Sequence, residues 1–340
     1  MEKPVRRIGL KHGSGGRAMR RLIEDTFLKL ASPVDGIGLS ALDDGAALRI
    51  GDRWLVVTTD SHVVKPAFFP GGDIGRLAVS GTVNDLAMMG ATEPAGLTCA
   101  VVLEDGFPLD DLERIVASMA EAAREAGAPF VTGDTKVMGK GELDGVVVNT
   151  TGVAFASRVV TDAGLRPGDR LLVTGTVGDH GMAIMSRRHD LRLEGDLHSD
   201  VAPLNGLVRE ALRAGGEDVV AMKDPTRGGV AGVLHEMAAK AKVGVVIDEA
   251  ALPIRDEVRA AAEMVGIDPL LVANEGKAVI GVRPGAVDRV LAALRAHPLG
   301  RDAAIFATAI ADRPGAVVLD TGLGKRLLAE PEGELLPRIC

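Results

Sequence analysis

Short apolar runs alternate with amphipathic segments along nearly the whole chain, and this alternation restricts its fold more than any other feature. An apolar run bounded by turn residues is typical of a strand, whereas apolar residues at helical spacing predict a helix. In the first half the predicted strands are 46–50, 54–59, 95–103, 129–133 and 144–156, and the predicted helices are 17–30, 73–89 and 108–126. Gly51 and Asp52 between the first two strands predict a hairpin, and Gly127 is a predicted helix C-cap.

The second half shows the same alternation. Its predicted strands are 170–175, 218–222, 243–247, 278–282, 304–310 and 316–320, and its longest helices begin near Val201, Gly229, Asp256 and Ala286. The turn at 166–169 separates the two halves, and a length of 340 residues suits two domains. We therefore expect an α/β (α+β) fold of two domains with mixed sheets and flanking helices, 1–165 and 166–330, followed by a mobile tail, 331–340.

Composition excludes several functional classes. Aromatic residues make up 2% of the chain and tyrosine is absent, so the cores must consist of Ala, Val, Leu, Ile and Met. A net charge of −8 without a basic stripe argues against nucleic-acid binding. No segment resembles a signal peptide or approaches the roughly 18 apolar residues of a membrane span. Two cysteines imply no disulfide framework, so we expect a cytoplasmic protein.

The last residue is a cysteine, Cys340, at the end of the segment PEGELLPRIC. Pro331, Gly333 and Pro337 interrupt this segment too often for a regular element. A thiol on such a tail suits a group carrier that is loaded at one active site and unloaded at another. A frayed end with an incidental cysteine is the alternative. The second cysteine, Cys99, lies in an apolar run and is predicted to be buried and inert.

Aspartates mark the predicted ends of several elements. Asp85 lies on the apolar stripe of the helix 73–89, where a carboxylate is costly unless it is hydrogen-bonded or binds a cation, and both explanations stay open. Asp60, Asp134 and Asp224 follow predicted strands, and the pair Asp43-Asp44 precedes one. Carboxylates without His or Cys partners favour Mg²⁺ over Zn²⁺. Because a polyphosphate beside carboxylates needs bridging divalent ions, MgATP is the expected ligand.

Two glycine-rich segments run directly into predicted helices. The amides of Gly13, Ser14, Gly15 and Gly16 could hold an anion at a helix N-terminus, although a flexible connector is the alternative. In the second segment, 224–229, Arg227 could hold a phosphate or be a surface charge. Lys136 and Glu275 are isolated charges beside apolar segments, and each would ordinarily be solvated.

The motifs occur in the order HGSGG, DDGA, TTDSHVVKPAFFPGGDIG, GTVNDLAMMGA, TGDTKVM, NTTG, DPTRGG, NEG and PRIC. In this order they resemble the HypE family of hydrogenase maturation factors, within the superfamily of aminoimidazole ribonucleotide synthetase and selenophosphate synthetase. The resemblance spans the whole chain. It implies two α/β domains and a homodimer whose N-terminal halves share a β-barrel-like interface, with ATP sites beside it.

The resemblance also implies a reaction. The carbamoyltransferase HypF would place a carboxamide on the sulfur of Cys340, and this chain would use ATP to dehydrate it to a thiocyanate. The cyano group would then pass to iron on the HypC–HypD scaffold, as a ligand of the [NiFe] hydrogenase centre. Phosphorylation turns the amide oxygen, a poor leaving group, into a good one.

The same resemblance implies the site residues. The Mg²⁺ ligands would be Asp44, Asp60, Asp85, Asp134 and Asp224, and the ATP-binding residues would be Asp43, Asp44, Asp60, Asp85, Asp134, Asn84, Gly13, Ser14, Gly15 and Gly16. Cys340 would carry the substrate. Lys136 would stabilise developing charge on the carboxamide, and Glu275 would take a proton from it.

Other functions stay open. Selenophosphate synthetases generally carry a cysteine or selenocysteine in the N-terminal glycine-rich segment, where this chain has HGSGG. Thiamine-monophosphate kinase needs no terminal thiol. A non-enzymatic thiol carrier or scaffold would use Cys340 as a soft metal ligand, but one cysteine without a nearby histidine makes a poor metal site.

Overall fold

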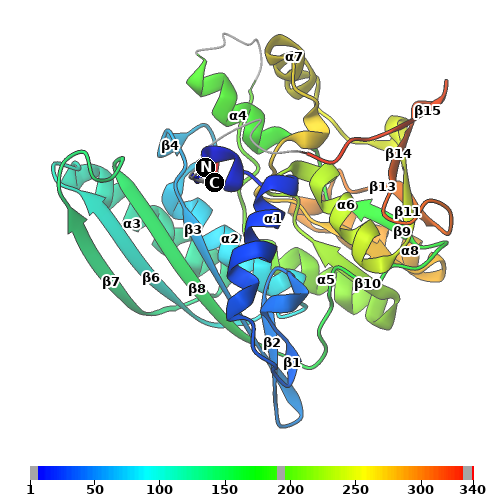
Figure 1. Cartoon of the computed structure of the whole chain (residues 1–340), viewed down its shortest axis with the longest axis horizontal. Helices are drawn as coiled ribbons and strands as arrows, with labels where there is room; N and C mark the ends of the chain where they lie inside the picture. Colours follow the sequence, from blue (N-terminus) through cyan, green and yellow to red (C-terminus); the bar gives the residue numbers. More distant parts are fainter. Residues whose placement is uncertain (1–6, 190–195, 332–338) are drawn as a thin grey trace, which may run out of the picture.

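The computed structural model describes residues 7–189, 196–331 and 339–340. Within these residues the chain forms two units side by side, each built around a sheet (Figure 1). The strands of the first sheet lie between Gly36 and Ala156, and those of the second between Arg170 and Leu327. Both sheets are mixed and are flanked by helices, which confirms the predicted fold class.

The first sheet has the strand order β1-β2-β3-β8-β6-β7. Its members are β1 (Gly36–Ile37), β2 (Ala46–Ile50), β3 (Arg53–His62), β8 (Val146–Ala156), β6 (Pro94–Glu104) and β7 (Phe130–Met138). The predicted hairpin is confirmed, because β2 and β3 pair antiparallel with Leu48 opposite Leu55. Helices α2 (Ile74–Met88) and α3 (Leu109–Ala126) lie on one face of this sheet (Figure 1). A short ribbon, β4 (Phe68–Phe69) with β5 (Gly72–Asp73), precedes α2.

The second sheet has the order β10-β12-β9-β13-β11-β14-β15. Its strands are β10 (Val219–Lys223), β12 (Val279–Val282), β9 (Arg170–Val173), β13 (Ala304–Ile310), β11 (Gly244–Asp248), β14 (Val317–Asp320) and β15 (Lys325–Leu327). Successive residues of β9 alternate between two cores: Leu171 and Val173 pack with α6 (Gly229–Ala241), and Leu172 packs with α5 (Asn205–Gly215) and α8 (Val287–Ala296). Helices therefore cover both faces of this sheet.

The boundaries of the predicted helices follow from local chemistry. Asp73 caps α2, since its Oδ1 accepts the amides of Gly75 and Arg76 at 2.7 and 3.1 Å. Gly127 ends α3 with a φ of 64°, which confirms the predicted C-cap. The first helix, α1 (Gly16–Thr26), is shorter than predicted and continues as a 3₁₀ turn over Phe27–Leu30.

Other predicted boundaries were wrong. Strands β3 and β7 continue past Thr59 and Gly133, so Asp60 and Asp134 lie inside strands and not after them. β7 is an exposed edge strand, where charged side chains are tolerated because they remain in water. Helices α4 (Asp179–Arg188) and α7 (Asp256–Val265) pack together on the second unit, and α4 was not predicted.

The predicted tail is described only at its two ends. Residues 332–338 lie outside the described part of the chain, whereas Pro331, Ile339 and Cys340 are described. Among the described helices, none combines the length and the apolar composition that crossing a bilayer would require.

Candidate active site

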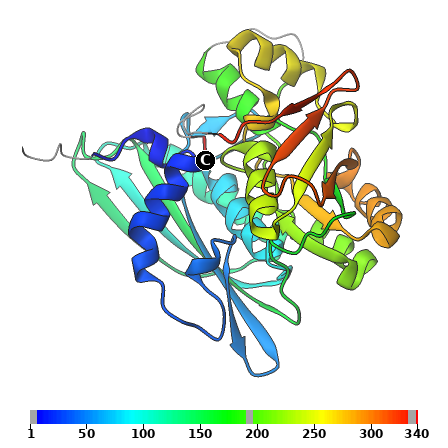
Figure 2. The same ribbon diagram turned by 45° about the vertical axis from the view of Figure 1, so that its right-hand side comes forward.

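A cavity of about 560 Å³ is lined by residues of both units and by Cys340, the last residue of the chain. The C-terminus lies between the two units (Figure 2). The walls of the cavity come from α1, the loop before β2, strand β3, α2, the loop after β10, and α6. The titratable residues that line it are Arg20, Glu24, Asp43, Asp44, Asp60, Asp85, Lys223, Asp224, Arg227, Glu236, Lys240, Glu275 and Cys340. Most of the predicted carboxylates and the carrier cysteine therefore share one cavity.

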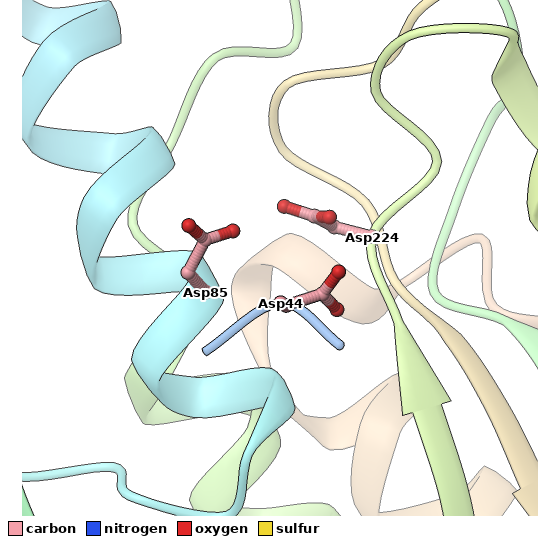
Figure 3. A group of neighbouring side chains, drawn as sticks. All are labelled: Asp44, Asp85 and Asp224. Carbon is pink, nitrogen blue, oxygen red and sulfur yellow. The ribbon is translucent and has the colours of Figure 1, made fainter. Parts of the chain in front are cut away.

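Three of the predicted metal ligands converge. Asp44, Asp85 and Asp224 each offer a carboxylate oxygen within 4.8 Å of the others (Figure 3). Asp44 lies in the loop before β2, Asp85 lies in the interior of α2, and Asp224 directly follows β10. We call these three residues the carboxylate cluster.

The sequence argument for Asp85 was only partly right. Helix α2 has no single core-facing stripe, because it is buried on almost every side; Arg76 and Asp85 are its only residues that are not buried. Asp85 instead faces the cavity, where its Oδ2 accepts a hydrogen bond of 2.8 Å from the Thr58 hydroxyl. Asp85 therefore combines a hydrogen bond with access to the cavity, so both explanations that the sequence left open still apply to it.

The carboxylate cluster fits a hard divalent cation. The Lys223 ammonium pairs with Oδ1 of Asp44, and Asp44 Oδ2 is buried without a hydrogen-bond partner among the described residues. Burial, followed by repulsion from the neighbouring carboxylates, raises the pKa of Asp85 well above its usual value and the pKa of Asp224 to about 8. A cation bound by one carboxylate oxygen of each residue would offset both the burial of the negative charges and their mutual repulsion. Mg²⁺ prefers such oxygen ligands.

Asp60 has a different electrostatic environment from the cluster. Burial would raise its pKa, but His62, Arg227 and the Ser61 amide outweigh this effect and hold the pKa below its usual value. Its Oδ2 lies 3.2 Å from Nε2 of His62, and its Oδ1 accepts the Ser61 amide at 2.8 Å. Asp60 therefore remains ionised beside the cluster and can add negative charge to a cation site.

A charged network also borders the cavity. The Lys240 ammonium donates to Oδ2 of Asp162 at 2.7 Å and to the Leu42 carbonyl at 2.6 Å. Asp43 lies beside this network, where burial first and then repulsion from Asp162 and Asp44 raises its pKa to about 7. Asp43 thus lines the cavity but lies outside the carboxylate cluster.

Cys340 lines the cavity together with Glu275 and Arg227. Burial raises the pKa of its thiol to about 12, although Arg227 opposes this shift. Glu275 is 3% exposed, and its Oε1 has no hydrogen-bond partner in the described part of the protein. Burial, then repulsion from Asp224 and Asp60, raises the pKa of Glu275 well above its usual value. A buried carboxyl group of this kind is suited to proton transfer near neutral pH.

Two predicted residues do not reach the cavity of their own chain. Asp134 and Lys136 lie on β7, with side chains 63% and 69% exposed, and they pair with each other at 3.3 Å. They are absent from the described lining of the cavity. Their roles at the ATP site were implied by the family resemblance, whereas the sequence around Lys136 predicted a solvated charge. The exposed edge strand places both side chains in solvent.

Three other predicted ATP-binding residues, Asn84, Ser14 and Gly13, make hydrogen bonds within the protein. The Asn84 side chain donates to the carbonyls of Ala202 and Glu275 at 3.2 and 3.3 Å, so it positions Glu275 and does not face the cavity. The Ser14 hydroxyl donates to the Leu10 carbonyl at 2.9 Å, as does the Gly13 amide. Gly15 and Gly16 do line the cavity.

The sequence did not identify the basic side chains that line the cavity. Lys223 ends an apolar strand and Lys240 lies in the last turn of α6, and both positions are ordinary for a surface lysine. For Arg227 the sequence left two alternatives open, a phosphate ligand or a surface charge. In the structure Arg227 lies close enough to Cys340 and Asp60 for their charges to raise its pKa. A lysine at the end of a fully apolar strand, directly before an aspartate, is the signal that could have identified Lys223.

Comparison of the sequence with known proteins identifies the family of this chain. Residues 42–156 match the model of the AIR synthase related protein, N-terminal domain, and residues 166–320 match that of its C-terminal domain. Carbamoyl dehydratase HypE of Rhizobium leguminosarum bv. viciae is 49% identical over 338 residues, which cover 98% of this chain and 95% of that protein.

Solved structures agree with the sequence comparison. A crystal structure of hydrogenase maturation protein HypE in complex with ATP is similar at a TM-score of 0.81 and 44% identity, covering 97% of this chain and 99% of that one. A crystal structure of a HypE–HypF complex is similar at a TM-score of 0.85 and 43% identity, covering 91% and 99%.

Proposed function

Because this chain belongs to the AIR synthase related family, and within it to the HypE carbamoyl dehydratases, we propose that it dehydrates a carboxamide carried on the sulfur of its own Cys340. The product is an S-cyanate, which supplies the cyanide ligand for [NiFe] hydrogenase maturation. One observation carries this proposal: Cys340 lines the same cavity as the carboxylate cluster and Glu275. A carrier sulfur and a phosphoryl-transfer site thus meet in one chamber.

The reaction balances as S-carboxamide plus ATP giving S-cyanate (thiocyanate), ADP and phosphate. The carboxamide oxygen attacks the γ-phosphorus of ATP, and the bond from phosphorus to the ADP oxygen breaks. The carbon–oxygen bond then breaks as phosphate leaves, and the two nitrogen-bound protons depart to form the nitrile. Mg²⁺ held by Asp44, Asp85 and Asp224 would neutralise charge on the triphosphate. Glu275 accepts a nitrogen-bound proton, and Arg227 offsets negative charge beside the sulfur.

Intact-mass spectrometry tests this function directly. The full chain is carbamoylated by its HypF-type partner and then incubated with MgATP. We expect the modified chain to lose the mass of one water, with one ADP released for each chain converted. A superfamily kinase or synthetase would consume ATP without altering the mass of the tail, and a thiol carrier or metal scaffold would bind metal without turnover.

The substitution Glu275→Gln should lower the dehydration rate roughly a hundredfold or more, because glutamine cannot accept the proton. Glutamine preserves the shape of the side chain and the backbone bond from the Glu275 amide to Asp200 Oδ1, which measures 3.0 Å. The rate of mass loss under single-turnover conditions is the measurement. Full dehydration by this variant would remove Glu275 from the mechanism.

A second copy of the chain explains the position of Asp134 and Lys136. Every residue of β7 is exposed, including Val131 and Val137 at 64% and 67%, and this strand forms an open edge of the first sheet. An open edge with exposed apolar side chains favours association with another sheet. We place these strands at a homodimer interface, through which Lys136 and Asp134 of each copy serve the cavity of the other.

Complementation between two inactive variants tests this arrangement. A heterodimer of Lys136→Ala with Cys340→Ala, isolated through two different affinity tags, should regain about half of the wild-type turnover per dimer, because one of its two symmetric sites is complete. The matched control pairs Asp85→Asn with Cys340→Ala and should stay inactive. If the first heterodimer is also inactive, Lys136 does not act across an interface.

The remaining partners follow from the same proposal. A HypF-type carbamoyltransferase loads Cys340, and an iron scaffold of the HypC–HypD type receives the cyano group. Both cysteines are free thiols, as is usual in a reducing compartment, so we place the reaction in the cytoplasm.

A further inference from the structure

The last two residues occupy a built site of their own. The Ile339 side chain is 5% exposed and belongs to an apolar core that also contains Val64, Phe69 and Val201. The main-chain oxygen of Cys340 accepts a hydrogen bond of 3.2 Å from the Val63 amide. These contacts use the Ile339 side chain and the main-chain oxygen of Cys340, and not the thiol assigned above to the reaction.

His180 completes this site. Its side chain is fully buried, and its Nε2 lies 2.8 Å from the Ile339 carbonyl oxygen. A carbonyl only accepts, so Nε2 carries the proton and donates. The other ring nitrogen, Nδ1, must then accept from the Ser199 hydroxyl at 2.8 Å, and the Ser199 oxygen accepts in turn from the Val201 amide at 3.1 Å.

Each donor in this series of hydrogen bonds points toward the tail, from the Val201 amide through Ser199 and His180 to the Ile339 carbonyl. The Ser199 amide is itself bonded to the Pro70 carbonyl at 2.8 Å, and the His180 ring packs edge-on against Phe69 with centroids 5.4 Å apart. The orientation of His180 is therefore set by the folded protein and not by the tail. A buried, pre-oriented donor aimed at one carbonyl is a recognition element.

We propose that His180, the Val63 amide and the apolar pocket around Ile339 form a docking site that recognises the penultimate residue and fixes the register of the carrier tail. His180 is then a positioning residue, because it places the sulfur of Cys340 in the cavity without touching the reacting atoms. Only the purpose of the docking site, which is to place the sulfur for the reaction, rests on the proposed function. Docking itself is a binding equilibrium that can be measured without catalysis. The site selects an apolar side chain at position 339 and rejects a charged one.

Thiol alkylation under native conditions measures this docking without requiring catalysis. The chain has two cysteines, so Cys340 reports docking and the half-buried Cys99 on β6 serves as an internal reference. In the full chain without nucleotide, His180→Leu should raise the alkylation rate of Cys340 about two- to tenfold relative to Cys99, the scale of one lost hydrogen bond. His180→Gln, which retains a donor, should recover most of the protection.

Matched variants complete the experiment. His198→Leu is the control, because His198 is exposed and pairs with Asp196. Ile339→Asp should raise the alkylation rate of Cys340 as strongly as His180→Leu, and Ile339→Val should leave it close to wild type. Circular dichroism and the thermal midpoint identify any variant that fails to fold.

The outcomes separate the inference from the proposed function. If folded His180→Leu and Ile339→Asp protect Cys340 as well as the wild type does, the docking site is refuted, whatever the enzyme catalyses. If the two variants expose Cys340 and also slow dehydration with unchanged nucleotide affinity, the docking site and the proposed function are both supported. If they expose Cys340 while the wild-type chain shows no dehydration, the docking site stands and the proposed function fails.

Discussion

The substitution Cys340→Ala should abolish formation of the tail cyanate completely while leaving the fold and MgATP binding intact. The sulfur is the attachment point of the carboxamide, and no other described side chain in the cavity could carry it as a thioester-like group. The main-chain contacts of residues 339 and 340 persist in the variant, because they use backbone oxygens. Intact-mass spectrometry after loading and MgATP addition measures the loss, and calorimetry measures the retained nucleotide affinity.

The second cysteine provides the control for this experiment. Cys99 lies on β6, outside the cavity lining, so Cys99→Ala should retain wild-type turnover. Normal delivery of cyanide ligands by the Cys340→Ala protein would overturn the carrier role. Loss of activity in both variants would indicate a general defect of folding and not the loss of a carrier.

The substitution Asp85→Asn should reduce turnover roughly a hundredfold or more, the scale for removing one charge-stabilising group from an active site. Asparagine keeps an oxygen that can accept from Thr58, so the local packing of α2 is preserved. It removes one of three mutually repelling carboxylates, so the metal-free variant should be at least as stable as the wild type. Activity and stability are therefore expected to change in opposite directions.

Thermal unfolding with and without MgATP distinguishes these two effects. The wild-type midpoint should rise on addition of MgATP, because a ligand that binds the folded state stabilises it, and the Asp85→Asn midpoint should rise much less. Asp179→Asn is a matched control, since Asp179 is a buried carboxylate outside the cavity lining whose pKa burial also raises. An Asp85→Asn protein that turns over normally would exclude the carboxylate cluster as the metal site.

The sequence predicted elements better than it predicted their surroundings. Periodicity identified α2 and α3, and turn chemistry identified the hairpin and the Gly127 cap, because each depends on neighbouring residues. It gave the wrong reason for Asp85, since α2 is buried on nearly every side and a stripe has no meaning there. It also placed Asp134 at the end of a strand that continues to Met138.

The motifs and their order, read from the sequence alone, determined the family and the two-unit α/β plan. The position of Cys340 at the end of the tail made it the predicted carrier. The tertiary structure alone decided that Asp44, Asp85 and Asp224 meet while Lys136 stays in solvent, and that His180 contacts Ile339. The physical reason is that secondary structure responds to neighbours along the chain. A metal site or a docking site depends on distances between segments far apart in sequence, and those distances exist only after the two units pack together.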